Sequence, residues 1–317
     1  MTDESIWYWI GFNVFVLLML LLDLGVFHKK DEAPKIKESL LWTVFWILLA
    51  LIFGLGVYVH LGHAKGLEFI TGYLLEKSLS IDNLFVFIML FGIFRIEPKY
   101  QHRVLFWGIF GAIILRAIFI FAGVALLNKF AWIMYVFGVF LIYTGIHMLF
   151  EKKDEAPHPE NNLIIRGFKK IFPVTHTIEN HDFFVKKNAK WHATPLFVAL
   201  LMIELSDVMF AVDSIPAVLS VSRDTFIVYT SNIFAILGLR SLYFAINGVM
   251  EYFYYLKYGL AGILGFIGLK MCLNEIYVDF GWGIEISNVT SLFIIIGFVA
   301  VAIIASVIRQ KKQTKTI

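Results

Sequence analysis

The sequence has little charge and almost no cysteine. Only 16% of its 317 residues are Asp, Glu, Lys or Arg, whereas soluble globular proteins carry about 25%. The single cysteine, Cys272, excludes an intramolecular disulfide and any metal site built from several thiolates. A zinc protease would need a His-Glu-x-x-His motif, which the sequence does not contain.

Apolar residues are abundant, at 59% of the chain with a mean hydropathy of +0.78. A helix needs about 20 apolar residues to cross the hydrocarbon core of a bilayer. We therefore expect an all-α polytopic membrane protein in contact with the lipid bilayer. The nine expected spans are 6–27, 40–61, 68–94, 104–127, 132–150, 195–221, 226–249, 258–276 and 286–308.

The first apolar run follows two acidic residues, and no small-residue cleavage site comes after it, so we expect a retained span rather than a signal peptide.

Basic residues lie mainly on one side of the expected spans. Twenty Lys and Arg residues fall in the connections after spans one, three, five and seven and in the tail, against Lys65, Lys129 and Arg223 on the other side. Because cytoplasmic loops are enriched in Lys and Arg, we expect the N-terminus outside and the C-terminus in the cytoplasm.

Two of the spans carry carboxylates near mid-membrane. Each such group costs about 2.5–3.5 kcal/mol on insertion scales, so it is expected to face the protein interior or a wet cavity. Both spans show an acid, five residues, then an Asp followed by a small polar residue. The resulting candidate residues are Glu76, Asp82 and Asn83 in the third span, and Glu204, Asp207, Asp213 and Ser214 in the sixth.

Spans three to five match spans six to eight in order. After the acids, Arg116 lies in span four and Arg240 in span seven, and Gly-Ile-His-Met at 145–148 corresponds to Gly-Leu-Lys-Met at 268–271. A three-span unit followed directly by its copy has to be inverted in the membrane, which is a transporter architecture. We therefore expect a 3+3 inverted repeat with its site where the two halves meet.

The repeat divides the chain into five parts. These are two peripheral helices (1–67), the first repeat (68–150), a cytoplasmic loop (151–194), the second repeat (195–276), and a last helix with a basic tail (277–317).

Acids six residues apart point about 120° away from each other on an ideal helix, so they converge only where the helix is distorted. Pro216 cannot donate to the carbonyl of Val212, beside Asp213. We therefore expect a discontinuous helix in span six, with freed carbonyls next to this acid. Carbonyls of this kind form cation sites in transporters.

Every candidate ligand is an oxygen, because spans three and six contain no His or Cys. Oxygen ligation suits Mn²⁺, Mg²⁺ or Ca²⁺ rather than Zn²⁺. Five ionised carboxylates would repel one another, so without metal some are expected to carry protons. The sequence therefore favours exchange of a divalent cation for H⁺, with no organic cofactor.

Other interpretations stay open at this point. In one alternative, the acids have no role other than to neutralise the buried bases Lys77, Arg116, Arg240 and Lys270. Asp82 with Asp207 or Asp213 could form an intramembrane aspartyl protease, but the usual Gly-x-Gly-Asp is absent. A non-transporting stress or assembly factor could bind a cytoplasmic partner, or a second copy, through 151–194. That loop holds His176, Glu179, His181 and Asp182, which could ligate a metal or belong to a solvated loop with a short surface helix; no segment points to nucleic acid.

Four segments, 72–83, 177–185, 204–216 and 230–240, make the chain similar to the TerC family of bacterial membrane proteins, and within it to the Alx-type members. The resemblance covers nearly the whole chain. It implies Mn²⁺ efflux across the bacterial inner membrane, carried by the acids of spans three and six, in a protein that is not an enzyme. The family is named for tellurite resistance.

Overall fold

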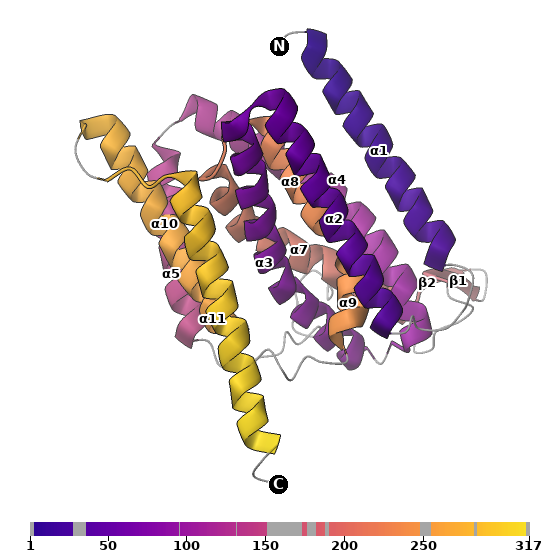
Figure 1. Ribbon diagram of the computed structural model, residues 1–317. Helices are drawn as coiled ribbons and strands as arrows, with labels where there is room; N and C mark the ends of the chain where they lie inside the picture. The colour runs from indigo at the N-terminus through magenta and orange to yellow at the C-terminus, as the bar shows by residue number, and fades with distance from the viewer. Residues whose placement is uncertain are drawn as a thin grey trace.

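The computed structural model is an assembly of long helices with one small hairpin (Figure 1). It describes residues 3–27, 36–94, 96–130, 132–150, 173–175, 182–187, 190–247, 255–281 and 284–314. The helices are α1 (Asp3–Phe27), α2 (Ile36–Leu61), α3 (His63–Ile93), α4 (Pro98–Lys129), α5 (Ile133–Phe150), α7 (Pro195–Leu219), α8 (Thr225–Ile236), α9 (Leu239–Asn247), α10 (Leu256–Phe280) and α11 (Asn288–Thr314).

Helices occupy every expected span, although α8 and α9 share the seventh. Among the described residues, seven helical segments are long and apolar enough to cross a membrane, with α8 and α9 together as one of them. The apolar part of α1 is shorter, and α3, which carries several charged residues, is not among the seven. An all-α polytopic membrane protein is thus confirmed, whereas the number nine stays a prediction.

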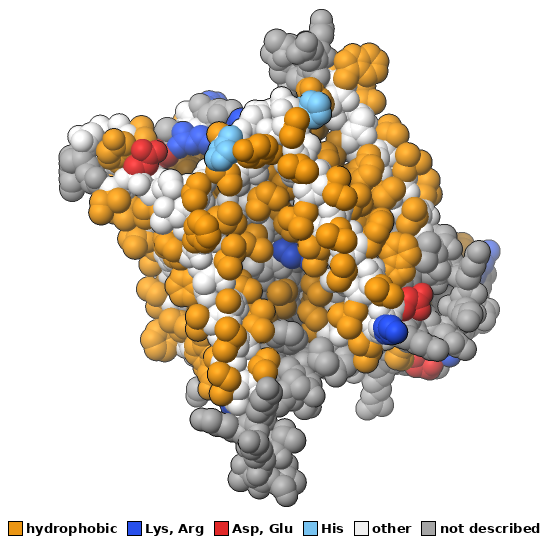
Figure 2. Space-filling model, in the orientation of Figure 1, with side chains coloured by type: hydrophobic (Ala, Val, Ile, Leu, Met, Phe, Trp, Pro, Cys, Tyr) orange, Lys and Arg blue, Asp and Glu red, His pale blue; other side chains and the backbone are white. Residues whose placement is uncertain are grey.

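The outer surface is apolar. Figure 2 shows hydrophobic side chains over most of one face, with charged side chains mainly toward the two ends. Leu41, Ile52, Phe293 and Val301 are each more than 60% exposed although they lie within long helices. Such a surface is stable only against lipid, since soluble proteins rarely expose large contiguous apolar patches.

The interior is built from two groups of helices. At the centre, α4 packs along α7 and α3 along α8, and α2 covers α3 and α9. Beside them, α5 and α10 make the most extensive contact in the molecule, while α11 packs on α10 and α3 (Figure 1). The α5–α10 contact is close because glycines face each other: a Cβ on Gly138 would lie 2.9 Å from the carbonyl oxygen of Gly268.

The helix break lies in span seven, not in span six. Helix α7 continues through Pro216 to Leu219, so the expected discontinuity beside Asp213 is wrong. Pro216 removes only the hydrogen bond to the Val212 carbonyl, and the helix ends three residues later, so little of it lies beyond the proline. The chain instead breaks between α8 and α9 at Gly238, where φ is +83°. A glycine fits there because other residues strongly disfavour this left-handed conformation.

The connection between α5 and α7 contains a hairpin, with β1 (Phe184–Lys187) antiparallel to β2 (Lys190–Ala193). Phe184 pairs with Ala193 and Lys187 with Lys190. The short surface helix expected in this loop does not occur in its described part, which is extended because of this strand pairing. His176, Glu179 and His181 lie outside the described residues, so the possible metal site at 176–182 is untested.

Candidate functional site

Arg116 lies at the middle of α4 and is 1% exposed. Its guanidinium donates to Glu76 Oε2 through Nη1 at 2.6 Å, and to the Asp207 carboxylate through Nη2 at 3.0 Å and Nε at 3.2 Å. Both acids are also buried. Charged hydrogen bonds of this forked type are among the strongest in proteins, so the three side chains form one rigid ionic cluster.

Two neutral side chains complete the surroundings of the guanidinium. Arg116 Nη1 lies 3.5 Å from Ser214 Oγ and 3.4 Å from Asn232 Oδ1. Asp207 and Ser214 are seven residues apart on α7, and that spacing places them on one helix face. The cluster therefore joins four helices, with Glu76 from α3, Arg116 from α4, Asp207 and Ser214 from α7, and Asn232 from α8.

Glu204 lies less than one turn before Asp207 on α7, and its carboxylate rests against the backbone of α4. Space for it exists because residue 111 is a glycine: a Cβ there would overlap the Glu204 carboxylate. In the described part of the structure, Glu204 Oε2 is buried without a hydrogen-bond partner. This oxygen is one of the acceptors that a cation or a proton could satisfy.

Asp213 faces away from the Arg116 cluster. It is only partly buried, and its Oδ1 accepts a hydrogen bond of 3.4 Å from Thr144 Oγ1 on α5. Of the remaining candidates, Asn83 is buried in α3. Asp82 belongs to the same helix, but its side chain lies outside what the structure describes.

The four acids whose side chains are described, Glu76, Glu204, Asp207 and Asp213, therefore do not converge on one site in this conformation. Among the described residues, no group of three His, Cys, Asp or Glu side chains is arranged to hold a metal ion. A guanidinium occupies the space between Glu76 and Asp207, and Asp213 lies on another face of α7. Pairing with a buried base, one alternative from the sequence, is thus observed for Arg116, while metal binding by the candidate residues stays a prediction.

Further oxygens beside the cluster have unused capacity. Within the described residues, Glu76 Oε1 and Ser80 Oγ are buried, and neither atom has a hydrogen-bond partner. They are four residues apart on α3, so they share a face. Buried polar atoms normally have partners, and exceptions are common where a ligand or ion binds.

Lys77 has a different environment from Arg116, although it follows Glu76 directly. Its Nζ donates to the carbonyl of Ala235 at 3.2 Å, in the last turn of α8. The C-terminal end of a helix carries a partial negative charge and exposes unpaired carbonyls, so it attracts a cation. The break at Gly238 places this helix end inside the protein, where Ala235 is fully buried.

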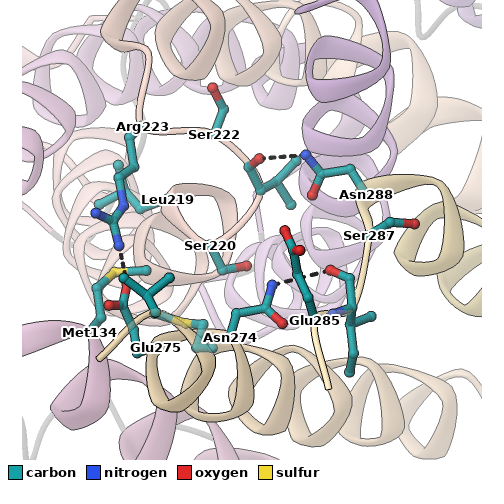
Figure 3. Close-up of a pocket in the computed structure, with 14 residues that line it drawn as sticks. Met134, Leu219, Ser220, Ser222, Arg223, Asn274, Glu275, Glu285, Ser287 and Asn288 are labelled. Carbon is teal, nitrogen blue, oxygen red and sulfur yellow. Dashed lines mark hydrogen bonds and ion pairs between the residues drawn. The ribbon is translucent and has the colours of Figure 1, made fainter. Parts of the chain in front are cut away.

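A separate pocket of about 270 Å³ lies where the α7–α8 connection meets α10 and the chain before α11 (Figure 3). We call it the end pocket; Ser220, Arg223, Glu275, Glu285 and Asn288 are among its lining residues. Arg223 forms an ion pair with Glu275, and Figure 3 shows the Glu285 side chain projecting between Asn274 and Asn288. The Asn288 amide donates to the carbonyl of Val221 at 3.0 Å and so ties α11 to the α7–α8 connection.

Sequence reasoning missed three residues around the acids. Asn232 is the last of three consecutive polar residues, 230–232, in an apolar span, and this run could have marked it. Thr144 precedes the Gly145 that was used to align the repeats. The role of Gly111 had no signal, because its importance depends on which side chain of α7 packs against it.

The sequence of the chain is similar to those of known proteins. Residues 61–314 match the model of the integral membrane protein TerC family. An uncharacterized membrane protein of Myxococcus xanthus is 50% identical over 96% of this chain and 92% of its own length. Proteins described as a proposed membrane-bound redox modulator, Alx, are 48% identical in Salmonella typhi and 46% in Escherichia coli, each over 85% of this chain and 86% of its own length. No solved structure matches the chain.

Proposed function

The chain belongs to the TerC family of integral membrane proteins, and from this membership and the buried carboxylates we propose that it exports a divalent metal cation, with Mn²⁺ as substrate and H⁺ as counter-ion. It would act in the bacterial inner membrane, with the N-terminus outside, and catalyse no chemical reaction. The observation that carries the proposal is the pairing of Glu76 and Asp207 with one buried arginine, with a third acid, Glu204, less than one turn from Asp207.

The charge of this group supports an ion as substrate. Two carboxylates bond to Arg116, and Glu204 adds a third within one turn of Asp207. Three ionised acids and one guanidinium leave two negative charges in a region where unpaired charge is costly. Two protons or one divalent cation would neutralise them, so the group has the charge that an exchanger of H⁺ for a divalent cation needs.

The packing of the helices supports the 3+3 inverted repeat. If α3, α4 and α5 correspond to α7, α8–α9 and α10, a two-fold axis requires that the contact of α4 with α7 has a counterpart between α3 and α8. Both contacts are extensive, and the corresponding helices α5 and α10 pack against each other. In this arrangement α1 and α3 would cross the bilayer as well, which gives nine crossings with α8 and α9 counted together.

The discontinuous helix also supports transport. Half-helices that end at mid-membrane and present carbonyls are typical of ion sites in secondary transporters. Here the end of α8 already binds a cationic group, the Lys77 ammonium. The break is in a different helix from the one that the sequence indicated, but its physical role is the same.

The candidate ligands are Glu76, Asp82, Asn83, Glu204, Asp207, Asp213 and Ser214. Oxygen ligation alone does not separate Mn²⁺ from Ca²⁺ or Mg²⁺, so the choice of Mn²⁺ rests on the family resemblance. The Alx relatives are named for redox modulation. The single cysteine gives this chain no intramolecular thiol pair, so we infer that any redox effect would follow from altered metal content.

The test is cation uptake into everted membrane vesicles under an imposed proton gradient, with Mn²⁺, Ca²⁺ and Mg²⁺ compared. Asp213→Asn and Asp82→Asn should abolish Mn²⁺ uptake at matched protein amounts. The control is Asp279→Asn, because Asp279 is exposed near the end of α10. If wild-type vesicles move no divalent cation, the transporter proposal fails. The 151–194 loop and its partners, or a second copy bound there, would then be the place to look.

A further inference from the structure

Arg116 occupies a place between two acids where a transported cation could also bind. Its guanidinium lies between Glu76 on α3 and Asp207 on α7, which belong to different halves of the chain. Both acids are nearly inaccessible, with side-chain exposures of 0% and 4%. A transported cation that used the same two carboxylates would have to occupy the volume that this guanidinium now fills.

We propose that Arg116 is a tethered counter-cation, which holds the place of the transported ion between Glu76 and Asp207 and leaves these carboxylates when that ion binds. This inference rests on the proposed function, since it concerns the same ion. Arg116 is thus a positioning residue that competes with the substrate and favours its release.

The structure offers the guanidinium a second set of acceptors. Ser214 Oγ and Asn232 Oδ1 lie 3.5 and 3.4 Å from Nη1, slightly beyond the length of a strong hydrogen bond. Asn232 is neutral and is not among the candidate ligands, so its amide oxygen can accept from Arg116 without competing with the metal ion. A shift of the guanidinium toward Asn232 on α8 would strengthen this contact when the guanidinium leaves the carboxylates.

Two of the acids each have one carboxylate oxygen that makes no hydrogen bond in the described structure. Glu76 Oε1 and Glu204 Oε2 are buried without partners in the described structure, although the other oxygen of Glu76 binds Arg116 tightly. A carboxylate that served only to neutralise a base would gain by engaging both of its oxygens. A partly used carboxylate beside Ser80 is a preformed fragment of an oxygen site that the guanidinium alone does not fill.

Competition of this kind has a measurable sign. Removing the tethered cation should make Mn²⁺ bind more tightly, because the ion no longer has to displace it, and should slow release. Loss of a purely structural pair would instead weaken both the fold and the ion site. Lys270 provides a control, because it is a buried basic group whose hydrogen bond goes to the Asn288 amide oxygen rather than to an acid.

The experiment measures Mn²⁺ binding to the purified full-length protein by the loss of the free-ion signal in electron paramagnetic resonance. We expect Arg116→Gln to bind Mn²⁺ on the order of 10-fold more tightly than wild type, within the range usual for coupled sites, while its flux in vesicles falls. Lys270→Gln should bind like wild type. Arg116→Lys, which keeps the charge but loses the fork, should fall between the two.

The outcomes separate the two proposals. If wild type binds and transports Mn²⁺ but folded Arg116→Gln binds it no more tightly, the tethered-cation inference is wrong and the proposed function stands. An equal gain in Lys270→Gln would overturn it too, because the effect would be general electrostatics. If wild type neither binds nor moves Mn²⁺, the proposed function fails.

A measurement on wild type keeps the inference testable if the Arg116 variants do not fold. Mn²⁺ should shift the guanidinium stretching band in infrared difference spectra, with arginine labelled by ¹⁵N for assignment. A protein that binds Mn²⁺ without this shift would contradict the displacement of Arg116.

Discussion

Arg116 and Asp207 meet through two hydrogen bonds that use both oxygens of the carboxylate, Nη2 to Oδ1 at 3.0 Å and Nε to Oδ2 at 3.2 Å. This forked pair connects α4 to α7 and so joins the two halves of the chain. Because Glu76 binds the same guanidinium, the pair also fixes the position of α3 relative to α7. The ionic cluster is therefore both the proposed ion site and a main structural tie of the core.

Asp207→Asn should destabilise the protein strongly. Breaking a buried ion pair at one partner costs about 3–5 kcal/mol, since it leaves a charge incompletely compensated. The control is Glu97→Gln, which removes an exposed, solvent-screened pair with Lys99 and should leave stability almost unchanged. Thermal unfolding in detergent measures both. Similar shifts in the two variants would mean that the cluster adds little to stability.

Gly111→Ala should impair transport by displacing the Glu204 carboxylate, which a Cβ at this position would overlap. Elsewhere in a helix the same change is favourable by about 0.5–1 kcal/mol. Gly297→Ala in α11 is the matched control, because nothing lies within 4 Å of its added Cβ. Mn²⁺ uptake into vesicles should fall in the first variant and be unchanged in the second. Full uptake by Gly111→Ala would show that the place of Glu204 is unimportant.

Gly238→Ala should destabilise the α8–α9 break by two separate effects. The left-handed conformation costs other residues about 1–2 kcal/mol, and the new Cβ would lie 2.7 Å from the Trp46 side chain. Gly281→Ala carries only the first effect, because its φ is +68° but its surroundings are open. Melting temperatures should therefore fall more for Gly238→Ala than for Gly281→Ala. An equal fall would mean that the packing of Trp46 adjusts freely.

The orientation can be checked with single cysteines in a Cys272→Ser background. Glu285→Cys, at the exposed edge of the end pocket, should react with a membrane-impermeant maleimide on whole cells. Lys190→Cys, at the exposed start of β2, should react only after permeabilisation. The reverse pattern would contradict an external N-terminus, since both expectations follow from the distribution of Lys and Arg.

The sequence predicted most of the fold because helix length and hydropathy are local properties. The mid-membrane acids were found for the same reason: a carboxylate in an apolar run has to be explained. The contact of Arg116 with Glu76 and Asp207 was foreseen only as an alternative, since a sequence does not show whether a buried base or a metal ion satisfies an acid. Asp213 is part of the same sequence spacing, but it lies on a different face of α7 from Asp207 and accepts a hydrogen bond from Thr144.

The misplaced helix break has a physical explanation. Pro216 is a strong local signal, but it lies in the last turn of α7, so only three helical residues follow the hydrogen bond that it removes. Gly238 is a weak local signal, because glycine is common in membrane helices. The need for glycine there comes from its left-handed φ and from Trp46 of α2, which leaves no room for a Cβ, and the second is a contact between residues far apart in the sequence.

The break between α8 and α9 has a consequence for how the protein is made. At 1.5 Å per residue, 12 and 9 residues give helices of about 18 and 14 Å, so neither spans a core of about 30 Å. The joined segment is the least apolar of the seven candidate spans and the most deeply buried against other helices. During synthesis this segment would gain little from entering lipid alone. Its membrane insertion therefore depends on α3 and α4, which are translated earlier and line the place that it occupies.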